Sequence, residues 1–149
     1  MRVLGYSLFV LSVLCLFSCE KEENNNSTTD FDLQCDEFII ENASRYQNDS
    51  SLYFGIDTIV LNGSCLDITI GASGCNGSTW NVDFIDEGVI MESLPIQRNA
   101  RVLLVENNEA CLAVPSRTFS FDLQPIQESS ENSLILNIDG WDESILYEY

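Results

Sequence analysis

The feature that most limits how this chain can fold is a series of short segments in which apolar and polar residues alternate. In the clearest of them, Phe119, Phe121 and Leu123 are separated by polar residues, and residues 66–70 repeat the pattern. Leu134, Leu136 and Ile138 also recur at every second position. A side-chain period of two is typical of a β-strand with one buried face. No window shows the apolar spacing of three and four residues that marks an amphipathic helix. The sequence therefore predicts an all-β domain.

Turn signals divide these segments about every ten residues, which is the spacing of strands in an all-β domain. Asn62-Gly63 lies between two β-branched runs and predicts a type I′ hairpin turn, and Asp139-Gly140 predicts a second tight hairpin. Residues 86–88 and 107–108 predict two further turns, the second leading back through residues 110–114. About seven to nine short strands connected in this way predict an antiparallel β-sandwich or a partly open barrel.

Three further segments bear on how the strands are arranged. Residues 100–105 are apolar on both faces apart from one arginine, which predicts a central strand. Near the end of the sequence Ile145, Tyr147 and Tyr149 share one face, so we expect this segment to be paired within a sheet. Residues 38–46 fit either a first strand or a short helix, and the pattern does not choose between them.

An apolar stretch precedes the predicted domain. Residues 3–17 are almost entirely apolar and follow a single basic residue. The stretch is shorter than the about 20 residues of a transmembrane helix and fits the hydrophobic region of a secretory signal. It ends in Leu16-Phe17-Ser18-Cys19, which resembles the lipobox of bacterial lipoproteins. The resemblance implies removal of residues 1–18 as a signal peptide, a diacylglycerol on the sulfur of Cys19 and a palmitate-type acyl group on its amino group. A plain secretory signal is the alternative.

Residues 19–34 are mostly polar and have few apolar side chains that could pack, so we expect a flexible tether. Within this segment Lys21-Glu22-Glu23 resembles the export signal that carries lipoproteins of the Bacteroidota to the outer face of the outer membrane. The resemblance implies a lipid-anchored protein of the outer membrane, displayed at the cell surface. A charged tether on a protein that faces the periplasm is the alternative. Residues 35–149 then form one domain, which is long enough to bury a hydrophobic core.

The cysteines of the predicted domain indicate disulfides. Cys15 is removed with the signal and Cys19 carries the lipid, which leaves four: Cys35, Cys65, Cys75 and Cys111. An even number in an exported chain predicts two bridges. The strand-like run between Cys65 and Cys75 separates its ends by about 20 Å, whereas bridged Cα atoms lie within about 7 Å, so these two do not pair. We prefer Cys35–Cys65 with Cys75–Cys111, and Cys35–Cys75 with Cys65–Cys111 remains open.

Composition excludes several classes of function. The sequence has 24 acidic and six basic residues, a formal charge of −18, which argues against nucleic acid and anionic lipid as partners. It has no histidine, so Ser-His-Asp and Cys-His nucleophiles and histidine-ligated zinc are excluded. The only lysine, Lys21, lies in the tether, which excludes Schiff-base chemistry and a P-loop. We therefore predict a domain that is not an enzyme and needs no cofactor. A pair of carboxylates is the remaining acid–base option.

One aromatic residue, Trp141, and one acidic turn are the candidate ligand-binding groups. Asp139, Asp142 and Glu143 could supply oxygen ligands, but the loop pattern of calcium sites is absent, so we predict a solvated turn without a metal. Trp141 lies among them after a turn and is the better candidate for an exposed aromatic that binds a sugar or another ligand. Trp80 lies on the apolar face of its segment and is predicted to be in the core.

A glycine-rich segment, residues 71–78, is similar to a phosphate-binding loop, but no helix follows to supply a positive dipole. We therefore predict a plain turn. Together with Arg101–Val105, Cys111 and Phe119–Pro125, its Ser73-Gly74-Cys75 resembles a group of small, uncharacterised Bacteroidota lipoproteins in which a Gly-Cys turn and a Phe-Asp-Leu-x-Pro strand recur. The resemblance supports a Cys75–Cys111 bridge and implies no activity. The histidine that often follows the Gly-Cys turn in that group is absent here.

Asp57-Thr58-Ile59 resembles the O-glycosylation site of Bacteroidota, which implies a sugar on Thr58. The leading hypothesis from the whole sequence is a lipid-anchored, non-enzymatic β-domain that acts as a binding or accessory module, with a glycan or protein partner at the cell surface. A carboxylate-dependent glycan hydrolase, or a purely structural surface protein, is the alternative.

Overall fold

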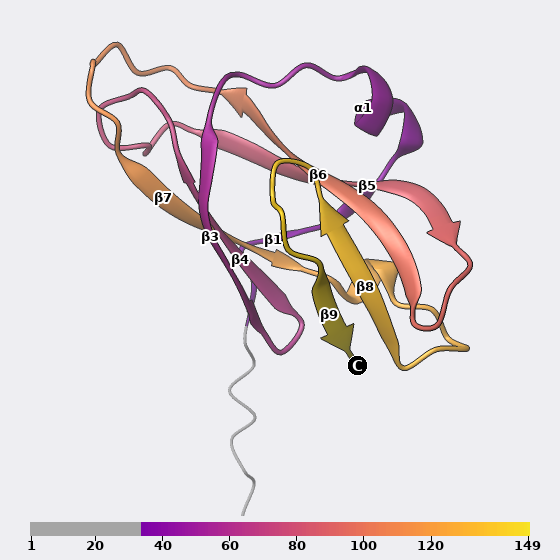
Figure 1. Ribbon diagram of the computed structural model, residues 1–149. Helices are drawn as coiled ribbons and strands as arrows, with labels where there is room; N and C mark the ends of the chain where they lie inside the picture. The colour runs from indigo at the N-terminus through magenta and orange to yellow at the C-terminus, as the bar shows by residue number, and fades with distance from the viewer. Residues whose placement is uncertain (1–33) are drawn as a thin grey trace, which may run out of the picture. The chain divides into compact units, whose positions relative to one another are not determined.

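The computed structural model describes residues 34–149, whose strands form two β-sheets packed face to face (Figure 1). Sheet A contains, in spatial order, β1 (Glu37–Phe38), β7 (Ser116–Asp122), β4 (Cys65–Gly71) and β3 (Gly55–Asn62). Sheet B contains β2 (Ile40–Glu41), β5 (Asn81–Met91), β6 (Ile96–Glu106), β8 (Ser133–Ile138) and β9 (Ile145–Glu148). The helical segments are α1 (Ala43–Asn48) and the short 3-10 helix η1 (Gln124–Ile126).

These nine strands of the described residues confirm the predicted all-β sandwich. Most neighbouring strands are antiparallel, as expected, but the pairs β1–β7, β2–β5 and β6–β8 are parallel. The predicted central strand is β6, the middle strand of sheet B, with β5 on one side and β8 on the other. The two sheets stay separate, so a sandwich describes the fold and a closed barrel does not.

The core lies between the sheets and is built from the faces that alternation predicted. On β4, Leu66, Ile68 and Ile70 are fully buried, and the two residues between them are only partly covered. Phe121 of β7 meets Phe84 of β5 across the gap, with ring centroids 5.3 Å apart. Burying each such side chain contributes about 1.5–3 kcal/mol, so these inward faces supply most of the stability.

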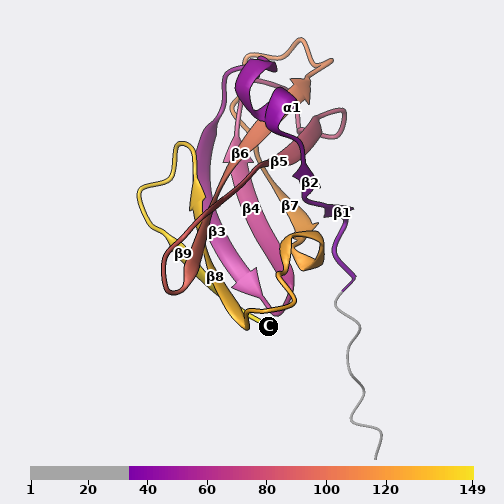
Figure 2. The same cartoon turned by 90° about the vertical axis from the view of Figure 1, so that its right-hand side faces the viewer.

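The segment whose secondary structure the sequence left open forms two short strands and a helix. β1 pairs with β7 of sheet A, β2 pairs with β5 of sheet B, and Ile39 between them is buried where the chain crosses. α1 then packs on the outer face of sheet B, because Arg45 binds Asp83 of β5 at 2.6 Å. Figure 2 shows β1, β2 and α1 following one another along one side of the sandwich. The start of the domain therefore covers part of this side of the sandwich.

The two predicted hairpin turns are shifted or longer than expected. Asn62 pairs with Cys65, so the central residues of the first turn are Gly63 and Ser64. Among the described residues only glycines have positive φ, and Gly63 has φ of 59°, as in a type II′ turn and not the predicted type I′. At Asp139-Gly140 a turn does form, but β9 begins only at residue 145, so a loop of residues 139–144 replaces the tight hairpin.

One other predicted turn is wrong, and the segment after another forms no regular strand. β5 continues through residues 86–88, where the register shifts and Gly88 adopts φ of 73°. The signal for a turn therefore marks a bulge, stabilised by the N–H of Gly88, which donates to the Asp86 carboxylate at 2.7 Å. Residues 110–114 form only a single bridge, between Gly74 and Ala113, because this segment binds the neighbouring loop and not a sheet.

Residues 72–80 and 107–115 lie together at one end of the sandwich, which we call the loop end (Figure 1). The opposite end carries the β3–β4 turn, the point where the described chain begins, and Tyr149. No helix within residues 34–149 is long and apolar enough to span a membrane. The predicted signal peptide, Cys19 and almost all of the predicted tether lie outside the described residues.

Candidate functional site

The two disulfides have the pairing that we preferred. Cys35 is bridged to Cys65 with Cα atoms 5.5 Å apart, and Cys75 is bridged to Cys111 with Cα atoms 4.8 Å apart. The first bridge ties the beginning of the described chain to the start of β4. The second joins the two long loops of the loop end and agrees with the resemblance to small Bacteroidota lipoproteins.

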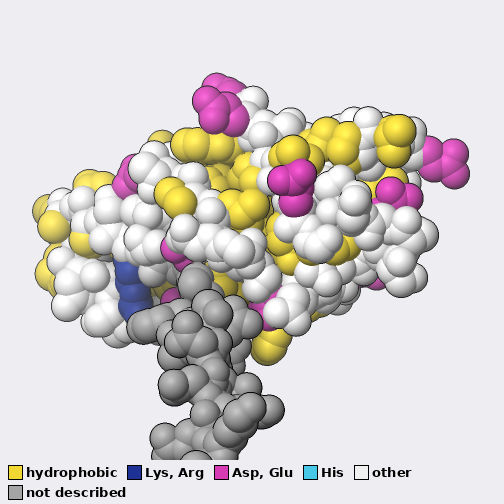
Figure 3. Space-filling model, turned by 90° about the horizontal axis from the view of Figure 1, so that it is seen from below, with side chains coloured by type: hydrophobic (Ala, Val, Ile, Leu, Met, Phe, Trp, Pro, Cys, Tyr) yellow, Lys and Arg dark blue, Asp and Glu magenta, His cyan; other side chains and the backbone are white. Residues whose placement is uncertain are grey.

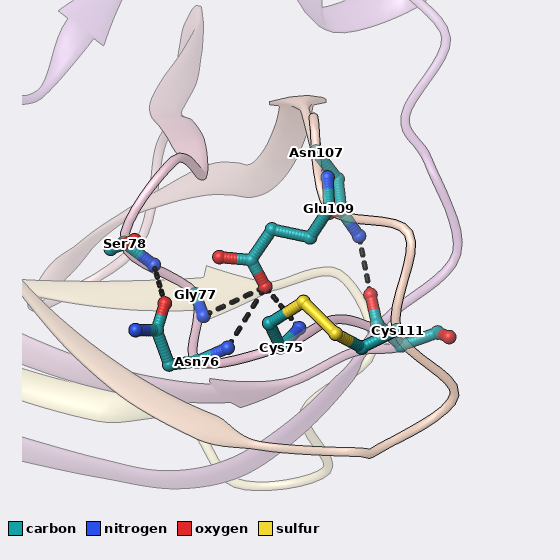
Figure 4. The surroundings of a disulfide bond; sticks show 8 residues. Cys75, Asn76, Gly77, Ser78, Asn107, Glu109 and Cys111 are labelled. Atoms are coloured by element: carbon teal, nitrogen blue, oxygen red, sulfur yellow. Dashed lines mark hydrogen bonds between the residues drawn. A yellow bond between two sulfur atoms is a disulfide. The ribbon is translucent and has the colours of Figure 1, made fainter.

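Beside the second bridge, the glycine-rich turn directs its backbone N–H groups at one carboxylate (Figure 4). The N–H groups of Asn76 and Gly77 each donate to Glu109 Oε2 at 3.0 Å, and the N–H of Cys75 donates to the same oxygen. Consecutive N–H groups that converge in this way form an anion-binding concavity. The predicted turn is present, and the anion that it holds is a side chain of the same molecule.

Glycine is required within this turn. A Cβ at Gly74 would collide with the Glu109 carboxylate and lie 3.2 Å from the indole nitrogen of Trp80. Gly77 has φ of 73°, in the left-handed region, and a Cβ there would lie 3.1 Å from the Trp80 ring. Trp80 itself is 6% exposed and belongs to the core cluster, as predicted. The glycines therefore let the turn lie between the Trp80 ring and the carboxylate.

The electrostatics of this contact predict a pH effect. Desolvation acts to raise the pKa of Glu109, but hydrogen bonds from the N–H groups of Gly77, Asn76, Cys75 and Thr79 outweigh it and hold the pKa below its ordinary value. A carboxyl with a depressed pKa stabilises the contact above its unfolded-state pKa of about 4.3, and the contribution is lost as the pH falls through the folded-state pKa.

We expect the amide proton shifts of Asn76 and Gly77 to titrate with an apparent pKa below the ordinary value of about 4.3, measured by NMR between about pH 2 and pH 6. The titration should vanish in Glu109→Gln and persist in Glu106→Gln, a control nearby on β6. Amide shifts that stay flat in the unsubstituted protein would show that Glu109 does not hold the turn in solution.

A second feature is a depression of about 350 Å³ between β3 and the loop before β9. Its lining comprises Ile56, Gly140, Trp141, Asp142 and Glu143. Trp141 is less buried than Trp80 and packs part of its ring against the core, so the remainder can meet a ligand. The aromatic candidate from the sequence therefore lies in a depression together with two of the three acidic candidates.

The third acidic candidate points elsewhere. Asp139 accepts a hydrogen bond at 3.2 Å from the hydroxyl of Tyr46, at the end of α1. Desolvation, followed by the nearby charge of Asp139, raises the pKa of Tyr46 to about 12. The carboxylates of Asp139, Asp142 and Glu143 do not form a metal site, and residues 34–149 hold no group of three or more side chains suited to one.

Arg98 is the main site residue that sequence reasoning missed. It is 2% exposed, and its guanidinium binds both carboxylate oxygens of the fully buried Asp86 at 2.7 and 3.1 Å. The same group binds Glu128 at 2.9 Å and also Glu41. Burial acts to lower the pKa of Arg98, but the bonds to Asp86 and Glu41 hold it above its ordinary value, so the group stays charged. These three carboxylates are therefore committed to a structural ion network.

The remaining arginines of the described residues are also engaged within the domain. Arg45 binds Asp49 and Asp83, Arg101 binds the backbone oxygen of Tyr46, and Arg117 binds that of Gly77. Residues 34–149 contain four arginines, no lysine and 19 acidic residues. On the face that Figure 3 shows, Asp and Glu side chains are scattered widely, whereas Lys and Arg cover a small area. The surface is therefore acidic, with little basic charge free to bind an anion.

Arg117 lines another depression, of about 320 Å³. It lies where β1 and β2 leave the halves of β7 and β5 nearest the loop end uncovered. The guanidinium of Arg117 lies over the ring of Phe119, 5.1 Å from the centroid. This arrangement is a cation–π contact, which satisfies the charge from within the domain. The other lining residues are Asp36, Glu37, Trp80, Asn81, Val82 and Thr118.

Comparison with known proteins supports the fold. No protein-family model matches the chain, and no curated protein matches it in sequence. Among solved structures it is similar to a protein of unknown function, DUF1344, from Bacteroides vulgatus, with a TM-score of 0.50 and 11% identity. The match covers 76% of this chain and 56% of that one, so this chain spans little more than half of its neighbour. The similarity shows a shared fold with a Bacteroidota protein of unknown function.

Proposed function

We propose that this chain is a lipoprotein whose acidic β-sandwich is anchored in the outer membrane through acyl chains on Cys19 and acts as a non-enzymatic binding module at the cell surface. The observation that carries the proposal is the distribution of cysteines. All four cysteines of the described domain form disulfides, which are typical of exported proteins. The next cysteine toward the N-terminus, Cys19, ends the apolar run in a lipobox.

The position of the anchor supports a display role. The described chain begins at the end of the sandwich opposite the loop end. Residues 19–34 could reach about 50 Å when extended, which is enough to hold the domain clear of a membrane. Several acyl chains anchor a protein far more firmly than one chain does. An anchor at this end leaves the loop end and the depression beside Trp141 free to meet a partner.

Two observations favour binding over catalysis. The carboxylates of Asp86, Glu41 and Glu128, which converge on one guanidinium, are bound to Arg98 and are not available as an acid–base pair. The depression beside Trp141 offers an aromatic face and two carboxylates, which suit recognition of a ligand. The glycan hydrolase would need its two carboxylates in one cleft, about 5–10 Å apart.

The test of the anchor is Cys19→Ser, with Cys15→Ser as the matched control. We expect the unsubstituted chain to incorporate labelled palmitate and to fractionate with the outer membrane, because the acyl chains supply the affinity. Cys19→Ser should lose both properties, whereas Cys15→Ser should keep them because that cysteine is cut away with the signal. Membrane fractionation that is unchanged in Cys19→Ser would refute the anchor. Protease accessibility on whole cells then separates display at the cell surface from the periplasmic alternative.

A further inference from the structure

We propose that the free edge of β3 and the depression beside Trp141 together bind an extended, positively charged peptide segment of a partner protein. The inference rests on the proposed binding function and names its partner class. Strand addition to a sheet edge derives its affinity from main-chain hydrogen bonds and its specificity from pockets for alternate side chains. Both elements are present side by side on the open side of this sandwich.

β3 is the outermost strand of sheet A and, among the described strands, pairs only with β4. Asn62 and Cys65 flank the two-residue turn and therefore form a hydrogen-bonded pair. Hydrogen-bonded and non-hydrogen-bonded pairs alternate along an antiparallel ladder, so Ile59 and Leu61 direct their N–H and C=O groups away from β4. These groups face the open edge, where another strand could bind them.

This edge also lacks the usual protection against strand addition. Natural sheets block their edges with lysine, proline, inward-pointing charges or bulges. Residues 58–62 contain no proline and no charged residue, and Val60 is 51% exposed. A bulge does occur at Asp57, whose carboxylate accepts a hydrogen bond from the hydroxyl of Ser116. The bulge therefore ends the regular edge and leaves Thr58–Asn62 as the accessible stretch.

The depression lies just beyond the bulge, next to the accessible stretch of β3, so a peptide that extends past Thr58 would reach it. Ile56 comes from β3, and Trp141, Asp142 and Glu143 come from the loop that precedes β9, the outermost strand of sheet B. A strand added to β3 would run along this open side, and every second side chain would point into the gap between the sheets. An indole face next to two carboxylates suits an ammonium or guanidinium group. The lining therefore favours a peptide with lysine or arginine at the alternate positions.

The charge of the domain points to the same partner. The four arginines of the described residues are engaged internally, whereas the same residues include 19 acidic side chains, so the domain attracts positive charge. Long-range attraction of this kind steers a basic partner to the surface, and it opposes edge-to-edge pairing with a second copy of the same acidic chain. A basic extended segment therefore fits the edge better than self-association.

The test measures binding of three terminally blocked peptides of eight residues to the full-length chain in detergent micelles. The first alternates valine and lysine, the second alternates valine and glutamate, and the third is the first with a methyl group on every backbone nitrogen, which removes all N–H donors whichever residues face β3. We expect only the first to bind by calorimetry, since the second carries the wrong charge and the third cannot form a ladder. The affinity should fall with added salt because both partners are charged.

Two variants of one residue separate the main-chain contact from side-chain packing. Ile59→Pro removes an N–H that faces the open edge without removing a hydrogen bond to β4, and Ile59→Ala removes a similar amount of side chain but keeps the N–H. We expect the dissociation constant to rise about tenfold or more in Ile59→Pro and by less than about threefold in Ile59→Ala. Asp142→Asn with Glu143→Gln should weaken binding and reduce its dependence on salt.

A measurement on the unsubstituted protein keeps the test independent of how the variants fold. Hydrogen exchange at the amides of Ile59 and Leu61 should slow when the lysine peptide binds, whereas exchange at Val60, bonded to β4, should not change. Absence of binding, equal binding of the glutamate peptide or equal effects of both Ile59 variants would overturn the inference. A glycan that binds through Trp141 when the peptides do not would also overturn it and leave the proposed binding function intact. Absence of lipid from the unsubstituted chain would refute the anchor and leave this inference to be judged by the peptide measurements.

Discussion

Arg98→Met should lower the free energy of unfolding by about 3–5 kcal/mol, because it leaves a buried charge without its partner. Asp86 is fully buried and receives two hydrogen bonds from the guanidinium of Arg98. Methionine fills a similar volume but cannot compensate the carboxylate, which would have to be protonated or exposed to water. A loss of this size is a large part of the about 5–15 kcal/mol that stabilises a typical domain. Urea denaturation followed by tryptophan fluorescence measures it directly.

Two controls separate the buried pair from the exposed part of the network. Adding Asp86→Asn to Arg98→Met should recover at least about half of the loss, because removing both charges of a buried pair is often nearly neutral. The asparagine keeps an oxygen to accept the N–H of Gly88. Glu128→Gln affects a partly exposed partner of Arg98 and should cost no more than about 1 kcal/mol. A mild effect of Arg98→Met alone would show that Asp86 is paired or hydrated in another way.

The Arg98 network also explains how the beginning of the chain is held. Its partners come from β2, from the bulge of β5 and from the segment after η1. β1 and β2 are two residues each and could not contribute many main-chain hydrogen bonds by themselves. The ion pair with Glu41 and the Cys35–Cys65 bridge therefore fix this segment at both ends. A tether attached here would be firmly joined to the domain.

Strands with one buried face could be predicted because their signal is local. On β4 the alternation of apolar and polar side chains alone decides which face is buried, and β8 follows it apart from Ile135; the structure places the alternating apolar faces in the core. The pattern does not report which strands are neighbours. The parallel pairs β1–β7 and β2–β5 depend on the crossing at Ile39, which joins residues about 45 to 85 positions apart in sequence. The alternation pattern therefore could not predict which distant strands pair.

The features that the sequence analysis missed differ in how much the sequence could have shown. Glycine with positive φ serves a turn and a bulge equally well, so Gly88 gave no means of telling them apart. Arg98 shares the inward face of its strand with Ala100 and Val102, and this position was a usable sign of a buried, paired arginine. Glu109 gave no such sign, because only the folded loops bring it to the N–H groups of Asn76 and Gly77.

The strand at the end of the printed sequence is expected to be essential for folding. Deleting Ile145–Tyr149 should leave the chain unfolded, because Tyr147 is 1% exposed and both neighbours on its face pack against the core. Replacing a buried aromatic residue alone costs about 3–5 kcal/mol, and the deletion also removes the pairing of β9 with β8. It further removes the hydroxyls of Tyr147 and Tyr149, which bind Gln127 and the N–H of Glu128. Circular dichroism and NMR dispersion of the truncated protein would measure the loss.

The outer face of the same strand supplies the control. Leu146 and Glu148 are exposed, so Leu146→Ala with Glu148→Ala should change stability by no more than about 0.5 kcal/mol for each residue. The contrast matters because β9 lies at the edge of sheet B, where main-chain pairing on one side is weak support for a strand. Its inward side chains must therefore hold it, above all Tyr147. A truncated chain that folds as a stable monomer would show instead that β9 frays without consequence and that the core closes without Tyr147.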